Sequence, residues 1–263
     1  MASLGTVTNS YMDSHGLHET ELVQETPIAI SINDVNYAVI MVTDVDVEAF
    51  VTGFAFSEGL INQASEILDI EFRSSEACDP LSSPHHILAN LVLTNRALQR
   101  SRSIMRQRRG ASGCGLCGIE AVEQAFPKLT PYHPIPTLSD DKWLSVKANF
   151  PEHQVIGQAS GAIHGAMLLD KSGEIVAFAE DIGRHNALDK LIGKAMIAQH
   201  ALKDCHILMS SRCSTELIMK ATRTQVASLA HLASPSHLAV QQAKQLGLHL
   251  IHLPRHAPPR HFN

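Results

Sequence analysis

The spacing of apolar residues predicts an irregular first half of the chain and a regular second half. Alternating and helical spacing in the first half predicts a β-hairpin, then a helix with one buried face, then two strands. The expected bounds are Pro27–Ile32 and Tyr37–Val42 for the hairpin, Val47–Leu60 for the helix, and Ile67–Phe72 and Ile87–Leu93 for the strands. Residues 1–24 are mostly polar, and we expect them to form a disordered tail.

Strands and helices alternate in the second half. Helices are predicted at 138–149, 185–200, 215–223 and 236–246, and strands at 166–169, 175–180, 206–209, 226–231 and 248–253. A β-α-β-α-β series places its strands parallel, with right-handed crossovers between them. The predicted fold class is therefore α/β, with a mixed sheet whose βαβαβ part lies at the C-terminal end.

A proline-rich stretch separates the two halves. Prolines at 127, 131, 134 and 136 break regular structure and mark a boundary between two subdomains. Residues 25–130 are expected to form a smaller N-terminal α+β subdomain that ends in a cysteine-bearing loop. Residues 137–263 are expected to form the α/β subdomain.

Composition narrows the classes of function. The chain has 263 residues, of which 44% are hydrophobic, so it can bury a sizeable core. A net charge of −5 argues against a polyanion-binding protein, and 5% aromatic residues argue against a stacking platform for single-stranded nucleic acid. No stretch reaches the ~20 apolar residues of a membrane span, and the N-terminus lacks the basic start and apolar centre of a signal peptide. We therefore expect a cytoplasmic protein that binds neither nucleic acid nor membrane.

Arginines gather just before the most distinctive motif. Arg100, Arg102, Arg106, Arg108 and Arg109 lie within one short stretch of a chain that is acidic overall. Such a cluster marks either an anionic partner or a solvated face of a helix or loop. The sequence favours neither interpretation, but the stretch would lower the pKa of thiols that fold beside it.

Cys114 and Cys117 stand in the segment Ser-Gly-Cys-Gly-Leu-Cys-Gly, residues 112–118. The glycines let the backbone bend and approach a partner closely. The chain has no second Cys-x-x-Cys pair to complete a structural zinc site, and the pair does not follow an early strand as it does in thioredoxin-type dithiols. From spacing alone, zinc binding, dithiol redox chemistry and a persulfide carrier all stay open.

Three polar segments are predicted where strands end, which is where α/β folds bind ligands. They contain Asp181, Arg184 and His185 (residues 180–190), His164 (residues 160–166), and Arg212 and Ser214 (residues 210–217). Small polar residues at a helix start bind anions through backbone N–H groups, and an arginine adds a fork for phosphate. Each segment also has a structural interpretation, since Asp181 and Ser214 are suitable helix caps and a lone histidine is more often structural.

These motifs together resemble the formate dehydrogenase accessory sulfurtransferase family, called FdhD or NarQ. The blocks occur in order at residues 53–61 (from Gly-Phe to Ser-Glu-Gly-Leu-Ile), 113–118 (Gly-Cys-Gly-Leu-Cys-Gly), 160–164 (Ser-Gly-Ala-Ile-His), 180–190 (Glu-Asp-Ile-Gly-Arg-His-Asn-Ala-Leu-Asp-Lys) and 210–216 (Ser-Ser-Arg-Cys-Ser-Thr-Glu). The resemblance runs from about Glu25 to Leu253. The 180–190 block is long, and its occurrence together with the cysteine block makes the resemblance specific.

The resemblance implies a sulfur carrier. Members of that family accept persulfide sulfur from a cysteine desulfurase and pass it to the bis-molybdopterin guanine dinucleotide molybdenum cofactor, before this cofactor enters apo-formate dehydrogenase. The match places the persulfide on Cys114, with Cys117 as its partner. It also implies a cytidine deaminase-like α/β/α core and a homodimer, with no permanent metal.

The resemblance further implies where the guanine-nucleotide moiety of the cofactor binds. The expected contacts are Leu253, Pro254, Arg255, His256, Ala257, Pro258, Arg212, Ser214, His164, Asp181, Arg184 and His185. Three positions depart from the usual pattern of the family. Ser160 stands where threonine is common, Ser211 stands where glycine is common, and the segment after the last strand lacks glycine but keeps a positive group in Arg255.

Two other functions compete with the sulfur carrier. A non-enzymatic chaperone would bind the cofactor and the apo-enzyme, with thiols that transfer no sulfur. A zinc or dithiol protein would use Cys114 and Cys117 for metal or redox chemistry. Deaminase-type zinc chemistry is not expected, because His164-Gly165-Ala166 lacks the required glutamate and the cysteine pair precedes this histidine.

Overall fold

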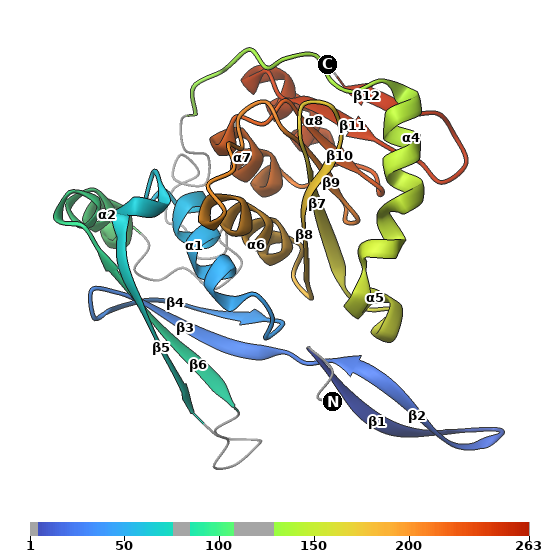
Figure 1. The fold of residues 1–263 in the computed structure, drawn as a ribbon, viewed down its shortest axis with the longest axis horizontal. Helices are drawn as coiled ribbons and strands as arrows, with labels where there is room; N and C mark the ends of the chain where they lie inside the picture. Colours follow the sequence, from blue (N-terminus) through green and yellow to red (C-terminus); the bar gives the residue numbers. More distant parts are fainter. Residues whose placement is uncertain (1–4, 76–84, 108–128, 263) are drawn as a thin grey trace.

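The computed structural model of the chain describes residues 5–75, 85–107 and 129–262. Strands within these ranges form sheets of two, four and six strands. In Figure 1 the six-stranded sheet and its helices form the upper body, the four-stranded sheet lies below, and the two-stranded hairpin extends from the lower edge. Mixed sheets with packed helices confirm the predicted α/β class. The cytidine deaminase-like core stays a prediction.

The two-stranded sheet replaces the predicted tail. Strands β1 (Thr6–Asp13) and β2 (Gly16–Val23) pair antiparallel along their full length, so the expectation of disorder over residues 1–24 is wrong for these strands. Threonine and valine favour extended backbone, and Gly16, with φ 123°, closes the turn. The prediction followed the polarity of the segment and overlooked its β propensity.

The four-stranded sheet has the order β4-β3-β6-β5 and contains all four strands predicted in the first half. Its strands are β3 (Thr26–Ile32), β4 (Val35–Val42), β5 (Ile67–Ser75) and β6 (His86–Leu93), and helix α1 (Val47–Ser57) and the 3-10 turn η1 (Ala64–Glu66) precede β5. Strands β3 and β6 are parallel, and the other pairs are antiparallel. Ile28 and Ile30 belong to a core cluster with Phe50 and Phe54 of α1, so this helix buries one face of the sheet.

The six-stranded sheet has the order β12-β11-β10-β9-β7-β8. Its strands are β7 (His164–Leu169), β8 (Ile175–Asp181), β9 (His206–Met209), β10 (Ser228–His231), β11 (His249–His252) and β12 (Arg260–Phe262). Strands β9, β10 and β11 are parallel, as predicted, while β7, β8 and β12 run antiparallel to their neighbours. Strand β12 was not predicted, because three residues of mixed polarity give no periodic signal.

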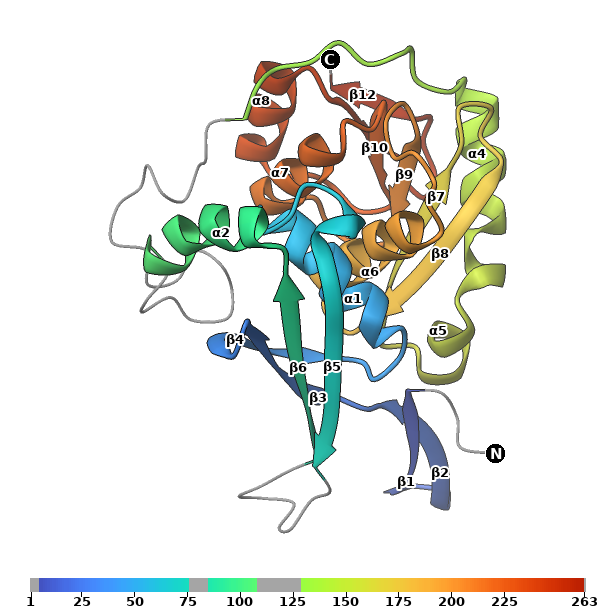
Figure 2. The ribbon, with the colours of Figure 1, turned by 60° about the vertical axis from the view of Figure 1, so that its left-hand side comes forward.

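Helices cover both faces of this sheet (Figures 1 and 2). The helices are α4 (Asp140–Asn149), α5 (Val155–Ser160), α6 (Arg184–Ile197), α7 (Thr215–Thr224) and α8 (His237–Leu246), with the 3-10 turn η2 (Phe150–His153) between α4 and α5. Leu191 of α6 and Leu217 of α7 lie in the core cluster of one face. Trp143 of α4 lies in the cluster of the other face, which gives three layers.

Helices α1 and α6 lie side by side and join the two parts of the molecule (Figure 2). A Cβ on Gly53 would lie 1.8 Å from the carbonyl oxygen of Asp189, and one on Gly193 would lie 1.8 Å from that of Ala49. Only glycine permits such an approach. The N-terminal sheet and the six-stranded sheet are therefore connected by a close helix crossing, while the boundary at the proline-rich stretch stays a prediction.

The sequence predicts Ser234 as the N-cap of helix α8, Pro235 in its first turn and Gly247 as the residue that ends it. Gly247, with φ 81°, ends the helix as expected. Its start differs, because Ser236 accepts a hydrogen bond from the backbone N–H of Ala239 at 3.2 Å. Ser236 is therefore the N-cap in place of Ser234, and Pro235 precedes the helix.

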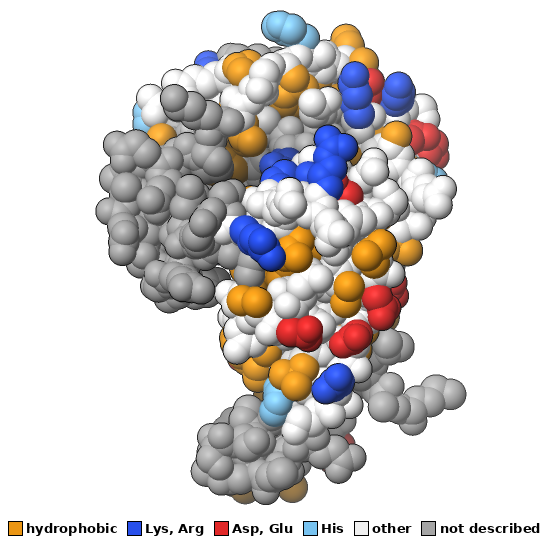
Figure 3. Space-filling model, turned by 90° about the vertical axis from the view of Figure 1, so that its left-hand side faces the viewer, with side chains coloured by type: hydrophobic (Ala, Val, Ile, Leu, Met, Phe, Trp, Pro, Cys, Tyr) orange, Lys and Arg blue, Asp and Glu red, His pale blue; other side chains and the backbone are white. Residues whose placement is uncertain are grey.

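Helix α2 (Asn95–Gln107) carries the start of the arginine cluster. Arg100 pairs with Glu66 at 2.5 Å and donates to the carbonyl oxygen of Leu60 at 3.3 Å, so part of the cluster fixes the turn after α1. On the face of the molecule at the left of Figure 1, most Lys and Arg side chains lie in the upper half, while Asp and Glu side chains lie in both halves (Figure 3). Arg108 and Arg109 lie outside the described residues.

Candidate functional site

The predicted polar segments meet at one edge of the six-stranded sheet. The parallel strands β9, β10 and β11 end at this edge, and the antiparallel strand β7 begins there. His164 pairs in register with Asp181 at the end of β8. Gly165 donates to the Ser210 hydroxyl at 2.9 Å, and Ser210 donates back to the Gly165 carbonyl at 3.0 Å. The fold thus brings residues of all three segments to one edge, as the sequence predicted.

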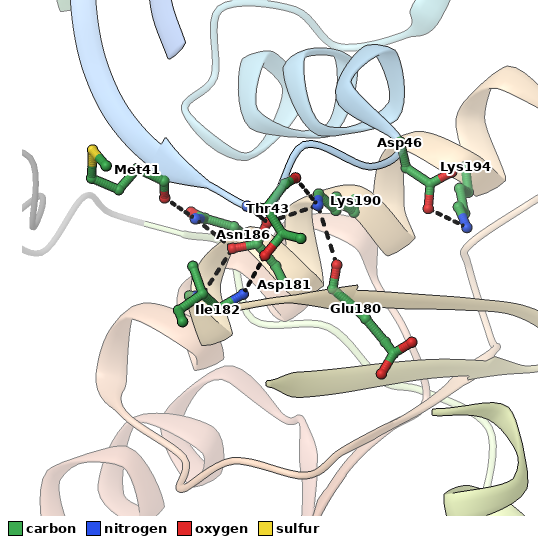
Figure 4. Close-up of polar contacts among 10 residues, drawn as sticks. Met41, Thr43, Asp46, Glu180, Asp181, Ile182, Asn186, Lys190 and Lys194 are labelled. Carbon is green, nitrogen blue, oxygen red and sulfur yellow. Dashed lines mark hydrogen bonds and ion pairs between the residues drawn. The ribbon is translucent and has the colours of Figure 1, made fainter. Parts of the chain in front are cut away.

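Asp181 lies within a buried network at this edge (Figure 4). Its carboxylate is 2.7 Å from the ammonium of Lys190, and both side chains are 0% exposed. Thr43 donates its N–H to one oxygen at 3.0 Å. Gly183 and Asn186 donate to the other oxygen at 2.8 and 2.9 Å. Four donors and full burial give this carboxylate a bracing role.

The same network ties β4 to α6. Lys190 donates to the carbonyl oxygens of Thr43 at 2.8 Å and Glu180 at 3.2 Å, and Asn186 donates to the carbonyl of Met41 at 2.8 Å. Burial lowers the pKa of Lys190, although the neighbouring carboxylate opposes this shift. The inner half of the 180–190 motif therefore fastens the four-stranded sheet to the six-stranded sheet.

Two more acidic groups position helices around the site. The Glu180 carboxylate accepts the backbone N–H of Ile156 at 3.0 Å and of Gly157 at 2.9 Å, which satisfies orphan donors at the start of α5. Asp46 pairs with Lys194 at 2.6 Å and so links the start of α1 to α6. These contacts position the helices around the site. The side chains that face the site come instead from Arg184, His185 and the residues at the start of α7.

His185 and Glu216 form a half-buried pair across α6 and α7. Nε2 of His185 lies 2.7 Å from Oε2 of Glu216 and 3.4 Å from the hydroxyl of Ser214. Burial acts to raise the pKa of Glu216, but the hydrogen bond and charge of His185, with help from Arg184, hold it below its usual value. One ring nitrogen faces both partners, so this group cannot relay a proton from serine to carboxylate as a hydrolase triad does.

Positive groups gather around His164. Burial, and then the charge of Arg184, lower the pKa of His164, and His185 and Arg212 act in the same direction while Asp181 opposes them. Arg184 and Arg212 come from different segments, and the Arg212 side chain is exposed. This edge therefore presents positive charge, which suits an anionic ligand.

The start of α7 adds a second attraction for anions. Ser214 is the N-cap residue, but its side chain makes no capping hydrogen bond, so the helix N-terminus is not closed by that hydroxyl. The backbone N–H groups and helix dipole there attract phosphate or carboxylate. Cys213 beside it is buried, and burial raises the pKa of its thiol, so this cysteine is an inert core residue.

The segment after β11 is anchored at its start and exposed beyond it. Leu253 is buried, and its N–H donates to the carbonyl of His231 at 2.8 Å. Lys147 of α4 donates to the carbonyl oxygens of Pro254 at 2.5 Å and Arg255 at 3.4 Å. The exposed side chains are Arg255, His256 and Pro258, with Ala257 half-buried. The segment thus leaves the sheet at the same edge as the strand-end groups.

Sequence patterns did not reveal three contributors. The sequence pattern gives Glu216 only the role of an acidic residue in a first helical turn. Its partner His185 lies far away in sequence, so the pattern does not reveal the pair. Lys147 contributes through backbone carbonyls, which no side-chain motif marks. His231 is fully buried and its Nδ1 donates to the carbonyl of Ser211 at 3.0 Å. All three act through contacts between segments that are far apart in sequence, so only the folded structure identifies them.

The predicted sulfur-carrying residues Cys114 and Cys117 lie outside the described residues. Within the part of the chain that the structure describes, no group of three or more His, Cys, Asp or Glu side chains is arranged to hold a metal ion. Over the same ranges, no helix has the length and apolar character needed to cross a membrane.

Comparisons with known proteins point to a single family. The sequence model of the FdhD/NarQ family matches residues 23–263. A protein of Burkholderia mallei named sulfur carrier protein FdhD is 36% identical over 237 residues, which cover 89% of this chain and 85% of that protein. The protein of the same name from Chromobacterium violaceum is 37% identical over 235 residues, which cover 87% and 83%.

A solved structure shares the fold. The crystal structure described as a formate dehydrogenase accessory protein from Desulfotalea psychrophila matches with a TM-score of 0.67 and 23% sequence identity. The match covers 98% of this chain and 96% of that chain. The arrangement of sheets and helices described above is therefore also found in an experimental structure.

Proposed function

Because the chain belongs to the FdhD/NarQ family, we propose that it is a sulfurtransferase for the bis-molybdopterin guanine dinucleotide molybdenum cofactor. It takes persulfide sulfur from a cysteine desulfurase and delivers it to this cofactor before insertion into apo-formate dehydrogenase. The names of its relatives support the carrier step. The structural observation that carries the proposal is the convergence of Arg184, His185 and Arg212 with the N-terminus of α7 at one sheet edge.

The sulfur step uses the two cysteines of the 112–118 segment. The Cys114 thiolate attacks the outer sulfur of the desulfurase persulfide, so one S–S bond forms while another breaks, and the desulfurase leaves as a thiolate. Once the cofactor is bound, Cys117 attacks the inner sulfur of the Cys114 persulfide. This attack releases the outer sulfur as hydrosulfide for the cofactor and leaves a Cys114–Cys117 disulfide. A thiol reductant then reduces this disulfide and restores the two thiols.

The cofactor is a substrate of this reaction, and its phosphates fit the strand-end site. Arg212 and Arg184 offer forked donors to phosphate, and the α7 start near Ser214 offers backbone N–H groups. The Leu253–Pro258 segment borders the site and is proposed to hold the guanine. His164 and His185 line the edge, while Asp181 fixes the turn that places Arg184 and His185.

The partners follow from this role. We propose a cysteine desulfurase as the sulfur donor, apo-formate dehydrogenase as the recipient of the finished cofactor, and a second copy of this chain as a permanent partner. We also propose the cytoplasm as the location, because persulfide chemistry needs thiols that stay reduced.

Intact-protein mass spectrometry tests the carrier step. The wild-type chain is incubated with an active cysteine desulfurase and cysteine, beside Cys114→Ala, Cys117→Ala and the core control Cys205→Ala. We expect one added sulfur, about 32 Da, on wild type and on Cys205→Ala, since burial raises the pKa of the Cys205 thiol and keeps it unreactive. Cys114→Ala should carry none.

Absence of added sulfur on the wild-type chain, with a desulfurase that turns over cysteine, would contradict the proposal. Retention of GDP binding in that case would indicate the chaperone, which needs the strand-end site but no transferable sulfur. Zinc bound in stoichiometric amount, and lost in the double variant of Cys114 and Cys117, would instead indicate a zinc protein.

A further inference from the structure

We propose that an extended, cationic segment of a partner protein binds along the outer edge of β5 and adds a fifth strand to the four-stranded sheet. The outer edge is the side of β5 that faces away from β6. The inference does not depend on sulfur transfer, because it rests on an unpaired strand edge, an apolar cavity beside it and the charges around both.

The outer edge of β5 offers a row of backbone hydrogen-bonding groups. Strand β5 is the last strand of its sheet and, over the described residues, pairs only with β6 (Figure 2). The Leu91 carbonyl of β6 accepts the N–H of Asn33 at 2.9 Å and therefore points away from β5. Ile70 lies opposite Leu91, so its backbone groups point away from β6 as well. Phe72 and Ser74, two and four residues further along, share this direction.

Most of these outward groups are available to a partner. The Ile70 N–H donates to the carboxylate of Asp69 at 2.9 Å, which agrees with its outward direction. Within the described ranges, the outward groups of Phe72 and Ser74 form no hydrogen bond. Such a row of main-chain donors and acceptors is the feature that binds an extended peptide as an additional strand.

The other edges of the two larger sheets are less suitable. On β8, lysines of α6 already donate to the carbonyls of Phe178 at 2.9 Å and Glu180 at 3.2 Å. On β4, Asn186 donates to the carbonyl of Met41 at 2.8 Å. Strand β12 has three residues, whereas β5 has nine. The longest edge that α6 leaves uncovered is therefore that of β5.

An apolar cavity of about 410 Å³ lies beside this edge, between α1 and β5. Ile70 and Phe72 line it from β5, and Ile197 lines it from the end of α6. Phe72 is 42% exposed and Ile197 is 46% exposed. Since residues two apart in a strand share a face, alternate side chains of an added strand lie on the same face as Phe72. Apolar side chains at these positions enter the cavity.

Acidic groups outnumber basic ones around the cavity and the edge. Glu48 of α1 and Asp69 line the cavity, and none of the residues described as lining it is basic. Glu71 and Arg73 lie on the opposite face of β5 from Phe72. All four charged side chains are exposed. Three carboxylates against one guanidinium favour a partner that carries Lys or Arg.

The occupant that fits is an extended segment in which apolar residues alternate with Lys or Arg. Its main chain pairs with β5, its apolar side chains enter the cavity, and its cations lie beside the carboxylates. The β1–β2 hairpin of a second copy does not fit this description. It carries Glu19 and Glu21, and no Lys or Arg occurs between residues 5 and 25.

Fluorescence anisotropy with a labelled peptide tests the proposal on the full-length chain. The probe is a peptide of alternating lysine and valine, about eight residues long to match the strand. We expect saturable binding with a Kd of about 1 mM or tighter, weakened by added salt. A peptide of alternating glutamate and valine should bind at least about tenfold more weakly, because it meets like charges.

Two substitutions of Phe72 separate the side chain from the backbone. Phe72→Ala removes the ring from the cavity and should weaken peptide binding at least about fivefold. Phe72→Pro also removes an outward N–H, which pairing with β6 does not use, and should weaken binding further. Leu88→Ala is the matched control, because Leu88 is also 42% exposed but lies on the opposite face of the sheet. Circular dichroism verifies that each variant is folded.

Hydrogen exchange followed by mass spectrometry shows whether a strand is added. Residues 67–75 should exchange more slowly with the lysine–valine peptide present, while residues 35–42 of β4 should not change. No saturable binding to the wild-type chain overturns the proposal, as does equal affinity for the glutamate–valine peptide. Binding that Phe72→Pro leaves unchanged overturns it too. A lower sedimentation coefficient of folded Phe72→Pro without peptide would show that the edge pairs with a second copy instead.

Discussion

At the scale of single residues, Arg212 is an exposed cation of the strand-end site that we expect to contact a phosphate. Arg212→Ala removes a charged, forked donor, and we expect the affinity for GDP to fall about 10- to 100-fold. Arg212→Lys keeps the charge without the fork and should lose less. Isothermal titration calorimetry with GDP measures the effect. Lys244→Ala, an exposed cation on α8, is the control, and an equal loss in both variants would contradict a specific phosphate contact.

Motifs identified the residues of the site more reliably than their roles. His185, Arg184 and Arg212 were predicted from polar clusters, and all three lie at the same sheet edge. Asp181 was predicted beside them as a cofactor contact, yet its carboxylate is fully buried against Lys190. Sequence cannot separate a ligand contact from a structural contact here. The difference lies in whether each side chain of the strand-to-helix turn points into the core or towards the site, and tertiary packing decides this direction.

At the scale of elements, the crossing of α1 and α6 depends on two glycines. Gly53→Ala would place a methyl group 1.8 Å from the carbonyl oxygen of Asp189, so the helices must separate. We expect a loss of about 3 kcal/mol or more in the free energy of unfolding, as for severe overpacking. Urea denaturation followed by circular dichroism measures it.

Gly161 is the control for this prediction. It has φ 69° and open space around its Cα, so Gly161→Ala costs only backbone strain, about 1 kcal/mol. A Gly53→Ala variant no less stable than Gly161→Ala would show that the helices can move apart at little cost. Such a result would contradict the tight crossing.

Elements with a clear period were predictable, and short or polar ones were not. The βαβαβ series from β9 to β11 follows from apolar runs and punctuating residues such as Gly247. The β1–β2 hairpin escaped prediction because its polar residues point to solvent on both faces, so alternation gives no signal. Strand β12 forms only because β11 offers an edge to pair with. Neither outcome is encoded in local apolar spacing.

At the scale of the whole molecule, the four-stranded sheet and the six-stranded sheet are fastened by buried contacts, and they should unfold together. The Asp181–Lys190 pair joins α6 to β8, and Thr43 brings the end of β4 into the same network. A charge buried at 0% exposure cannot be hydrated, so each member depends on the other. The close crossing of α1 and α6 also couples the unfolding of the two sheets.

Lys190→Met tests this coupling, because it leaves the Asp181 carboxylate buried without its counter-ion. We expect a loss of about 3–5 kcal/mol in the free energy of unfolding, measured by urea denaturation. Adding Asp181→Asn removes the uncompensated charge and should recover part of the loss. Lys194→Met breaks a pair with Asp46 that is about one-third exposed and should cost at most about 1 kcal/mol. One cooperative transition in every variant would show that both sheets form a single unit, whereas two transitions in the wild-type chain would show that the buried pair does not couple them.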